Sequence, residues 1–275
     1  MDYLNIKQAI RKDKKLQKSL LLMFLSMATI VINIFVHKYL VLNYGSNGFE
    51  AYTFIITFYA VLSIPILLGS RLFFLKNNLD VRFLNKSFQV FSLIGIISSI
   101  VLGIFIYLSS PLIMEIEYLK YVNYSLILYF VIYCINSFFN SYFNAIDRQI
   151  TTIVLNNIFP LLLILGILFV GTQLNIFLIY SLVFILGLLF SLIILLKRKV
   201  FSFKKSSTDI KLLYKESFSL GFSDAIFLIS NKIMILSISL YSEGLKEMTE
   251  YNIAFNLSNI TLLAVTSLNL AYGPA

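Results

Sequence analysis

The sequence predicts an all-α, polytopic transmembrane bundle of about eight membrane-spanning helices. Three observations lead to this fold class. Apolar residues make up 59% of the 275 residues and charged residues only 13%, which leaves too little polar surface to cover a water-soluble globule. The mean hydropathy is high, at +0.88. The apolar runs are continuous and about 20 residues long, whereas strands of an outer-membrane barrel are about ten residues long and alternate in polarity.

Eight apolar segments follow one another along the chain, and each is long enough to cross a bilayer as a helix. In order, they span residues 19–40, 51–70, 90–108, 122–145, 151–170, 176–196, 217–241 and 251–272. The first segment follows a charged arm, but it is longer than a signal-peptide core and lacks a clear cleavage site. We expect it to remain in the protein as a membrane anchor.

Lys and Arg alternate between the connections, which supports both the helix count and an orientation. Most of the 22 basic residues lie in the N-terminal arm and in the second, fourth and sixth connections, whereas the odd-numbered connections hold only Lys120 and Lys246. By the positive-inside rule, the N-terminus and the even connections are cytoplasmic in a multi-pass protein of the cytoplasmic (inner) membrane. If one predicted helix were not a membrane span, the basic connections after it would lie on the opposite side of the membrane, so the regular alternation supports the count of eight.

The longest polar interval, residues 197–216, divides the chain into two lobes. We expect an N-terminal lobe of six helices in residues 1–200, a basic cytoplasmic linker in residues 201–216, and part of a second lobe, with two helices, in residues 217–275. With or without a boundary there, a loop this rich in Lys would lie close to anionic lipid headgroups.

Polar side chains line one face in four of the eight segments. These faces comprise Ser26, Thr29, Asn33 and His37 in the first segment; Tyr129, Tyr133, Asn136, Asn140 and Asn144 in the fourth; Ser223, Asp224, Ser230, Asn231 and Ser237 in the seventh; and Asn252, Asn256, Asn259 and Thr266 in the eighth. In the first, seventh and eighth segments we expect them to border a water-filled cavity, which implies a transported solute. In the fourth, hydrogen bonds between packed helices explain the row equally well. The third and sixth segments carry few polar residues and are expected to face lipid.

Two ionisable residues of the seventh segment are candidates for direct roles in transport. Lys232 lies about 22 Å along the helix from its cytoplasmic start, and its neighbours one turn away are Leu228 and Leu236. Its partner is therefore another helix, water or an anionic ligand, unless its long side chain reaches the opposite interface. Asp224 lies about 10 Å into the same helix. It is a candidate coupling site for H⁺ or Na⁺, or else an acid at the interface.

The sequence carries no signature of covalent chemistry. It lacks H-E-x-x-H, G-x-S-x-G and phosphate-loop motifs. Cys134 is the single Cys and His37 the single His, so neither a disulfide framework nor a zinc site can be assembled. The net charge of +9 comes from cations at helix ends, where membrane topology explains them better than nucleic-acid binding does. We expect no enzymatic activity, no cofactor, no metal and no nucleic-acid partner.

The first helix and its exit, residues 33–52 (NIFVHKYLVLNYGSNGFEAY), resemble the opening of the polysaccharide flippases of the MATE-like superfamily, which also includes lipid II flippases and multidrug exporters. Gly45, Gly48 and Tyr52 match the short loop that follows the first helix in that family. A weak internal repeat relates Lys38 and Tyr52 to Lys232 and Tyr251, as expected of two lobes of like orientation.

Residues 212–274 resemble the start of the second lobe of the same family. Asn231 and Lys232 occupy the position of an Asp-Arg-like pair, Tyr251 and Ala254 open the next helix, and Pro274 ends it. Asn231 departs from the usual Asp, which puts the role of that acid in doubt. The family has about a dozen helices or more, so this chain resembles a truncated or partial member with one full lobe and about a third of the second.

The resemblance implies a flippase that moves a polyprenyl-diphosphate-linked oligosaccharide or polysaccharide repeat unit across the membrane by alternating access between membrane lipids. The expected substrate contacts are Lys232, Asn231, Asn33, His37, Asn252, Asn256 and Asn259, and the expected ion-coupling residue is Asp224. Three alternatives remain. A cation-coupled multidrug exporter would need more intramembrane acids, and a membrane-embedded polysaccharide polymerase or transferase would need a large extracytoplasmic loop. The third is a scaffold that transports nothing.

Overall fold

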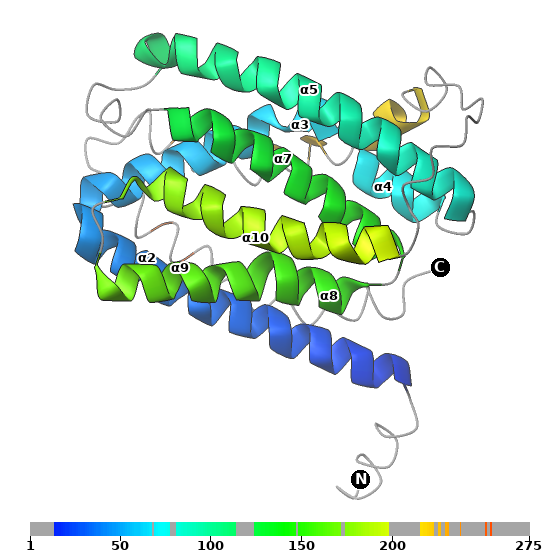
Figure 1. The fold of residues 1–275 in the computed structure, drawn as a ribbon, viewed down its shortest axis with the longest axis horizontal. Helices are drawn as coiled ribbons and strands as arrows, with labels where there is room; N and C mark the ends of the chain where they lie inside the picture. The colour runs from blue at the N-terminus through cyan, green and yellow to red at the C-terminus, as the bar shows by residue number, and fades with distance from the viewer. Residues whose placement is uncertain are drawn as a thin grey trace, which may run out of the picture.

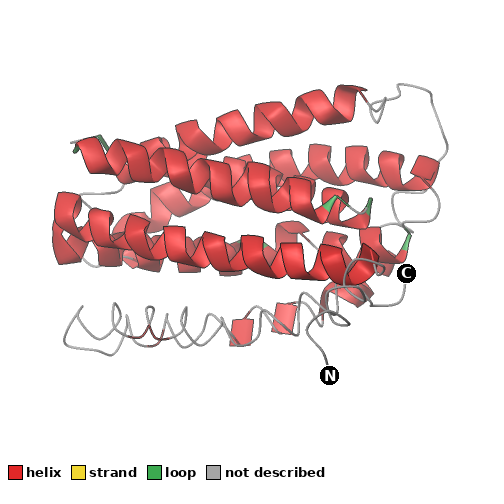
Figure 2. Cartoon of the chain, turned by 90° about the horizontal axis from the view of Figure 1, so that it is seen from below, coloured by secondary structure: helices red, strands yellow, loops and turns green. Residues whose placement is uncertain are grey.

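The structure, a computed structural model, describes residues 14–67, 69–77, 81–113, 124–146, 148–171, 174–197 and 215–222, together with residues 225–226, 229–230, 237, 251 and 254. Its named elements are α2 (Lys14–Leu62), α3 (Ile64–Leu67), α4 (Ser70–Lys76), α5 (Val81–Ile113), α7 (Tyr124–Ala145), α8 (Gln149–Ile153), the π-helical turn η1 (Val154–Ile158), α9 (Phe159–Val170) and α10 (Ile176–Lys197). Within these residues there is helix and no strand (Figure 2), which confirms the all-α fold class.

Five helical stretches among the described residues are long and apolar enough to cross a membrane. They are Gln17–Leu67, Arg82–Leu112, Tyr124–Ala145, Gln149–Val170 and Ile176–Lys197. A membrane protein is therefore supported. The first six predicted segments overlap these stretches, although the second and fourth, residues 51–70 and 122–145, extend two or three residues beyond them. The seventh and eighth fall largely outside the described residues, so the count of eight helices and the incomplete second lobe stay predictions.

The first of these stretches is 51 residues long and contains two helical arms that meet at Gly45. Gly45 has φ 75° and ψ 174°, a backbone conformation outside the helical region that only glycine adopts readily. In one straight helix, His37 and Phe49 would lie about 18 Å apart. Their ring centroids are instead 5.0 Å apart, because the chain reverses direction at Gly45 (Figure 1). The predicted first segment is therefore the first arm of α2. The predicted second segment, residues 51–70, is only partly the second arm, because α2 ends at Leu62 and the chain continues through α3 to the start of α4.

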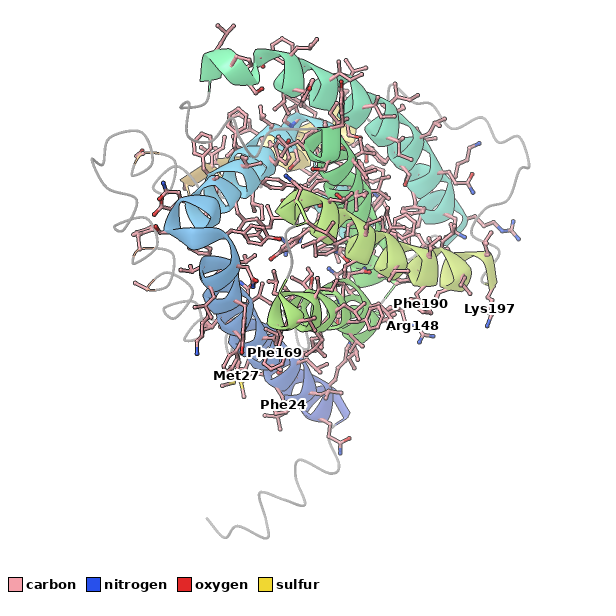
Figure 3. All side chains as sticks on the ribbon, turned by 60° about the vertical axis from the view of Figure 1, so that its left-hand side comes forward. Phe24, Met27, Arg148, Phe169, Phe190 and Lys197 are labelled. Carbon is pink, nitrogen blue, oxygen red and sulfur yellow. The ribbon has the colours of Figure 1, made fainter. Side chains whose placement is uncertain are left out.

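Most basic residues that the structure describes lie at one end of the bundle, here called the basic end; Lys38, near the turn at Gly45, is an exception. The basic end holds the start of α2, all of α4, the start of α5, α8 and the end of α10 (Figure 1). Arg148 and Lys197 lie there together in Figure 3, and Arg71, Lys76 and Arg82 belong to α4 and α5 at the same end. This arrangement agrees with the alternation of charge in the sequence. The cytoplasmic assignment of the basic end stays a prediction.

The core lies around α7, which packs against α4, α5, α8 and α10. Between α5 and α7 the helices approach closely, because a Cβ on Gly95 would lie 2.1 Å from the ring of Phe138. Nearer the basic end, α4, α5 and α7 share an aromatic cluster. Its members are Phe73, Phe74, Phe88, Phe91, Phe139 and Tyr142. Aromatic pairs at such separations stabilise packing beyond the area they bury.

The lipid-facing surfaces agree only in part with the sequence prediction. Helix α5 exposes a row of large apolar side chains, as expected: Leu93, Ile97, Ile100, Val101, Ile104, Phe105 and Leu108. Helix α10 differs from the prediction for the sixth segment. It exposes residues such as Leu186 and Phe190, but it buries Phe177, Ser181 and Ser191 against its neighbours. One face of α10 is therefore part of the core. On the first arm of α2, Phe24 and Met27 point outward (Figure 3).

Candidate functional site

The second arm of α2 gives way to an irregular segment inside the bundle, between Leu62 and Ser70. Pro65 is the second residue of α3, and proline cannot donate the backbone hydrogen bond that would continue α2. Gly69 then adopts φ 67°, which favours glycine because a side chain is strained there. The Ser63 hydroxyl donates to the Ala60 carbonyl at 2.8 Å. The break turns the chain so that Ser63, Ser70 and Arg71 face α7.

A pocket of about 290 Å³ lies between this irregular segment, α7 and the helical segment 215–222 with Ala225. We call it the polar pocket. Its lining residues are Ala60, Ser63, Ile64, Leu67, Gly69, Ser70, Arg71, Tyr133, Ser137, Asn140, Ser141, Asn144, Gly221 and Ala225. The five residues from α7 recur at three- and four-residue spacing, so they share one face of the helix. Among the described residues of this lining Arg71 is the only charged one, and the pocket lies toward the basic end.

The polar pocket offers both donors and acceptors to a ligand. The hydroxyls of Ser137 and Ser141 each donate to a carbonyl one turn back on α7, at 2.9 and 2.8 Å, which leaves their oxygens available as acceptors. Arg71 contributes a guanidinium, which has donors only. The side-chain oxygen of Asn140 accepts a hydrogen bond from Asn156 at 2.6 Å. Such a surface suits a ligand that carries hydroxyl groups and negative charge.

An aromatic layer lies beside the polar pocket, toward the Gly45 end of the bundle. Tyr133, which lines the pocket, is 6.4 Å from Tyr129 between ring centroids. Tyr129 in turn lies 6.1 Å from Tyr59 and 6.2 Å from Tyr180, and the Tyr59 hydroxyl donates to the Leu126 carbonyl at 3.3 Å. The rings of Tyr59, Tyr129 and Tyr180 are buried among α2, α7 and α10, and they border the polar pocket through the partly buried Tyr133.

The predicted site residues fall into two groups in the structure. Asn33 and His37 are described, and both lie on the first arm of α2; neither lines the polar pocket. Asp224, Asn231, Lys232, Asn252, Asn256 and Asn259 lie outside the described residues. The substrate-binding and ion-coupling roles of all eight therefore stay predictions.

The row of polar residues on the fourth predicted segment meets two different surroundings along α7. Asn140 and Asn144 line the polar pocket together with Tyr133, whereas Tyr129 belongs to the aromatic layer. The side-chain oxygen of Asn136 is buried with no hydrogen-bond partner among the described residues. Asn140 fits both interpretations of this segment. It borders a pocket, and it also hydrogen-bonds to Asn156 across a helix interface.

Arg71 is the pocket residue that sequence reasoning assigned differently. It was counted among the cations of the second connection, because residue 71 follows the apolar segment 51–70 directly. The available signal was the sequence Gly69–Ser70–Arg71 after Pro65, which indicates a broken helix with a cation next to an apolar span. Metal chemistry has no support in the described residues, where no group of three His, Cys, Asp or Glu side chains could hold an ion.

Comparison of the chain with known protein families, with curated proteins and with solved structures gives no match in any of the three. The resemblance to MATE-like flippases therefore depends on residues 33–52 and 212–274 alone.

Proposed function

We propose that this chain is a flippase that moves a polyprenyl-diphosphate-linked oligosaccharide or polysaccharide repeat unit across the cytoplasmic membrane by alternating access. The observation that carries the proposal is the polar pocket, in which Arg71 stands among Ser, Asn and Tyr side chains inside an apolar bundle. No carboxylate lines it among the described residues. A substrate with acidic and hydroxyl groups matches this surface, whereas a cationic drug does not.

The chemistry of the substrate explains why such a pocket is needed. A diphosphate that enters hydrocarbon without partners loses its hydration at a cost of many kcal/mol, on the order of tens for an isolated ion. The Arg71 guanidinium would replace part of that hydration with charge-assisted hydrogen bonds. The hydroxyl and amide groups on α7 would do the same for the sugar, and the polyprenyl tail would remain in lipid beside the exposed apolar faces. No covalent step is required of the protein.

The size and place of the polar pocket suggest which part of the substrate it holds. About 290 Å³ is at the small end for a ligand site, since pockets for drug-sized ligands have volumes of roughly 300–1,000 Å³. We assign it to the diphosphate and the first sugar, with the rest of the saccharide in solution. With the basic end in the cytoplasm, the pocket loads from the cytoplasmic side, and the aromatic layer must open for release. Asp224, with H⁺ or Na⁺, remains our candidate for coupling.

Replacing Arg71 with glutamine is expected to slow translocation by about tenfold or more, because hydrogen bonds to charged groups contribute about 1.5–3 kcal/mol. The measurement uses proteoliposomes that contain a fluorescent polyprenyl-diphosphate saccharide and follows the label that becomes accessible to an external quencher. Arg148→Gln is the matched control, because it removes the same charge from an exposed residue that does not line the polar pocket.

We expect Arg148→Gln to retain translocation within about twofold of the wild type, since an exposed charge makes little difference. An uncharged polyprenyl glycoside of the same sugar serves as a second control and should not be moved. The proposal is wrong if Arg71→Gln translocates as fast as the wild type, or if the uncharged glycoside moves equally fast.

A further inference from the structure

We propose that Asn156 is a positioning residue: it holds the side-chain amide of Asn140 so that the NH₂ group of Asn140 faces the polar pocket. The pocket then presents hydrogen-bond donors from both Arg71 and Asn140, and it selects ligands rich in acceptors, such as a diphosphate. This inference rests on the proposed function, because it assumes that the polar pocket binds the substrate. Asn156 does not line the pocket itself.

The first observation is a directed chain of three side chains that runs from α10 to the pocket. The Ser191 hydroxyl donates to the side-chain oxygen of Asn156 at 3.2 Å. The side-chain nitrogen of Asn156 donates to the side-chain oxygen of Asn140 at 2.6 Å. Asn156 is only 1% exposed and Ser191 is fully buried. Asn140 is the one member of the chain that lines the polar pocket.

The direction of this chain fixes which end of the Asn140 amide faces the pocket. A hydroxyl can donate or accept, whereas an amide has an oxygen that accepts and a nitrogen that donates. In the structure the Ser191 hydroxyl donates to the oxygen of Asn156, so the nitrogen of Asn156 faces Asn140, which accepts with its oxygen. The reverse orientation of Asn140 would set two donor groups against each other in a buried site, which costs about 1–3 kcal/mol for an unsatisfied polar group.

The backbone around Asn156 explains how it reaches both partners. Residues Val154–Ile158 form a π-helical turn, a wide turn that recurs at functional sites. The cause is in the sequence: Pro160 follows Asn156 by four residues, and the proline ring would clash with the carbonyl of Asn156 in a regular α-helix. The wider turn removes that clash and rotates Asn156 toward α7 and α10.

Helix α10 can supply Ser191 only because it approaches η1 closely at Gly187. A Cβ on Gly187 would lie 2.8 Å from the Leu155 carbonyl oxygen and 3.7 Å from the side-chain oxygen of Asn156. Ser191 lies one helical turn after Gly187 and so faces the same neighbour. Pro160, Gly187 and Ser191 are thus all consistent with the placement of one buried amide.

Binding of farnesyl diphosphate to the full chain in lipid nanodiscs tests the inference through a double-mutant cycle. We expect Asn140→Leu and Asn156→Leu each to weaken binding by about tenfold, equivalent to about 1.4 kcal/mol. The double variant should lose no more than either single variant, because Asn156 acts through Asn140. Asn157→Leu, the same change one residue later, is the control and should stay within about twofold.

Several outcomes would overturn the inference. One is tenfold weakening in Asn140→Leu with wild-type binding in Asn156→Leu; another is a double variant whose loss is the product of the two single losses. If Asn156→Leu does not fold, Ser191→Ala tests the same chain with a smaller change. It should weaken binding about threefold, and wild-type binding in that variant contradicts the inference.

The same binding measurements distinguish a wrong proposed function from a wrong positioning role for Asn156. If neither the wild type nor the Arg71→Gln variant binds farnesyl diphosphate, the polar pocket takes no diphosphate, and both the function and the inference are wrong. If the wild type binds and Arg71→Gln is weakened while Asn156→Leu is not, only the positioning role is wrong.

Discussion

Replacing Phe88 with alanine is expected to lower the free energy of unfolding by about 3–5 kcal/mol, the range for removing a fully buried aromatic ring. Phe88 has no exposed surface, and its ring centroid lies 4.5 Å from that of Tyr142 and 5.4 Å from that of Phe139. The substitution would leave a cavity between α5 and α7 that the surrounding rings fill only partly. Phe105→Ala on the same helix is the matched control, because Phe105 is 63% exposed.

The buried thiol of Cys134 provides the measurement. Cys134 is the single cysteine of the chain and lies fully buried on α7, so its reaction with a maleimide reports opening of the core. Across a denaturant series, labelling of Phe88→Ala should begin at a much lower denaturant concentration than labelling of the wild type. For Phe105→Ala the free energy of unfolding should change by less than about 0.5 kcal/mol, as for a surface substitution. Equal shifts would mean that the two faces of α5 are not divided into core and lipid surface.

The division of α5 shows what hydropathy can and cannot predict. The apolar run 90–108 predicts a membrane span there, and the structure contains it, but the helix begins earlier, at Val81. Its first turns are amphipathic: Leu84 and Phe88 are buried, whereas Arg82 is exposed. The mean hydropathy of such a mixed stretch is too low to predict a membrane span. Its apolar residues nevertheless continue at helical spacing, which indicates an amphipathic helix. The predicted segments therefore identify the spans better than they identify the helix ends.

The candidate site was predictable to a smaller extent, because periodicity is local and a pocket is not. The spacing of Asn140 and Asn144 correctly identified a polar face on the fourth segment. It carried no information on which segment lies opposite. That the chain breaks near Pro65 and brings Arg71 to α7 depends on contacts between residues about 70 positions apart, which no single-helix pattern contains.

The packing face of α10 also could not be predicted from its sequence. Its composition is almost uniformly apolar, so its sequence has no face that contrasts with the rest, and lipid exposure was the natural prediction. Ser191 and Gly187 carry its contact with η1. Small residues at such positions let helix backbones approach closely in membranes. Their importance becomes visible only when the partner, Asn156, is known.

Replacing Gly69 with alanine is expected to destabilise the protein more than replacing Gly45 with alanine, although both glycines have positive φ, 67° and 75°. At Gly69, with ψ 17°, a side chain carries the strain of a left-handed residue, about 1–2 kcal/mol. At Gly45, with ψ 174°, the backbone lies in a region that essentially only glycine adopts, where strain costs about 1–3 kcal/mol. A Cβ on Gly45 would meet nothing within 4 Å, whereas one on Gly69 would lie 2.4 Å from the Cα of Gly221. The Gly69 variant therefore also has to displace the segment 215–222, at a further cost of about 1–3 kcal/mol.

Ligand binding isolates this backbone contact better than stability does, because both variants carry backbone strain but only Gly69 lines the polar pocket. Gly69 and Gly221 both line the polar pocket, so displacement of the segment 215–222 should also weaken farnesyl diphosphate binding in Gly69→Ala and leave it unchanged in Gly45→Ala. The exposed pair of Lys76 and Glu216, 3.9 Å apart, adds little to hold the segment in place. Close contact between two glycine backbones, together with the packing of Leu220 against the core, then holds this wall of the pocket in place. Equal stability and equal binding in the two variants would show that α4 and the segment 215–222 do not pack tightly, and the polar pocket would lose its third wall.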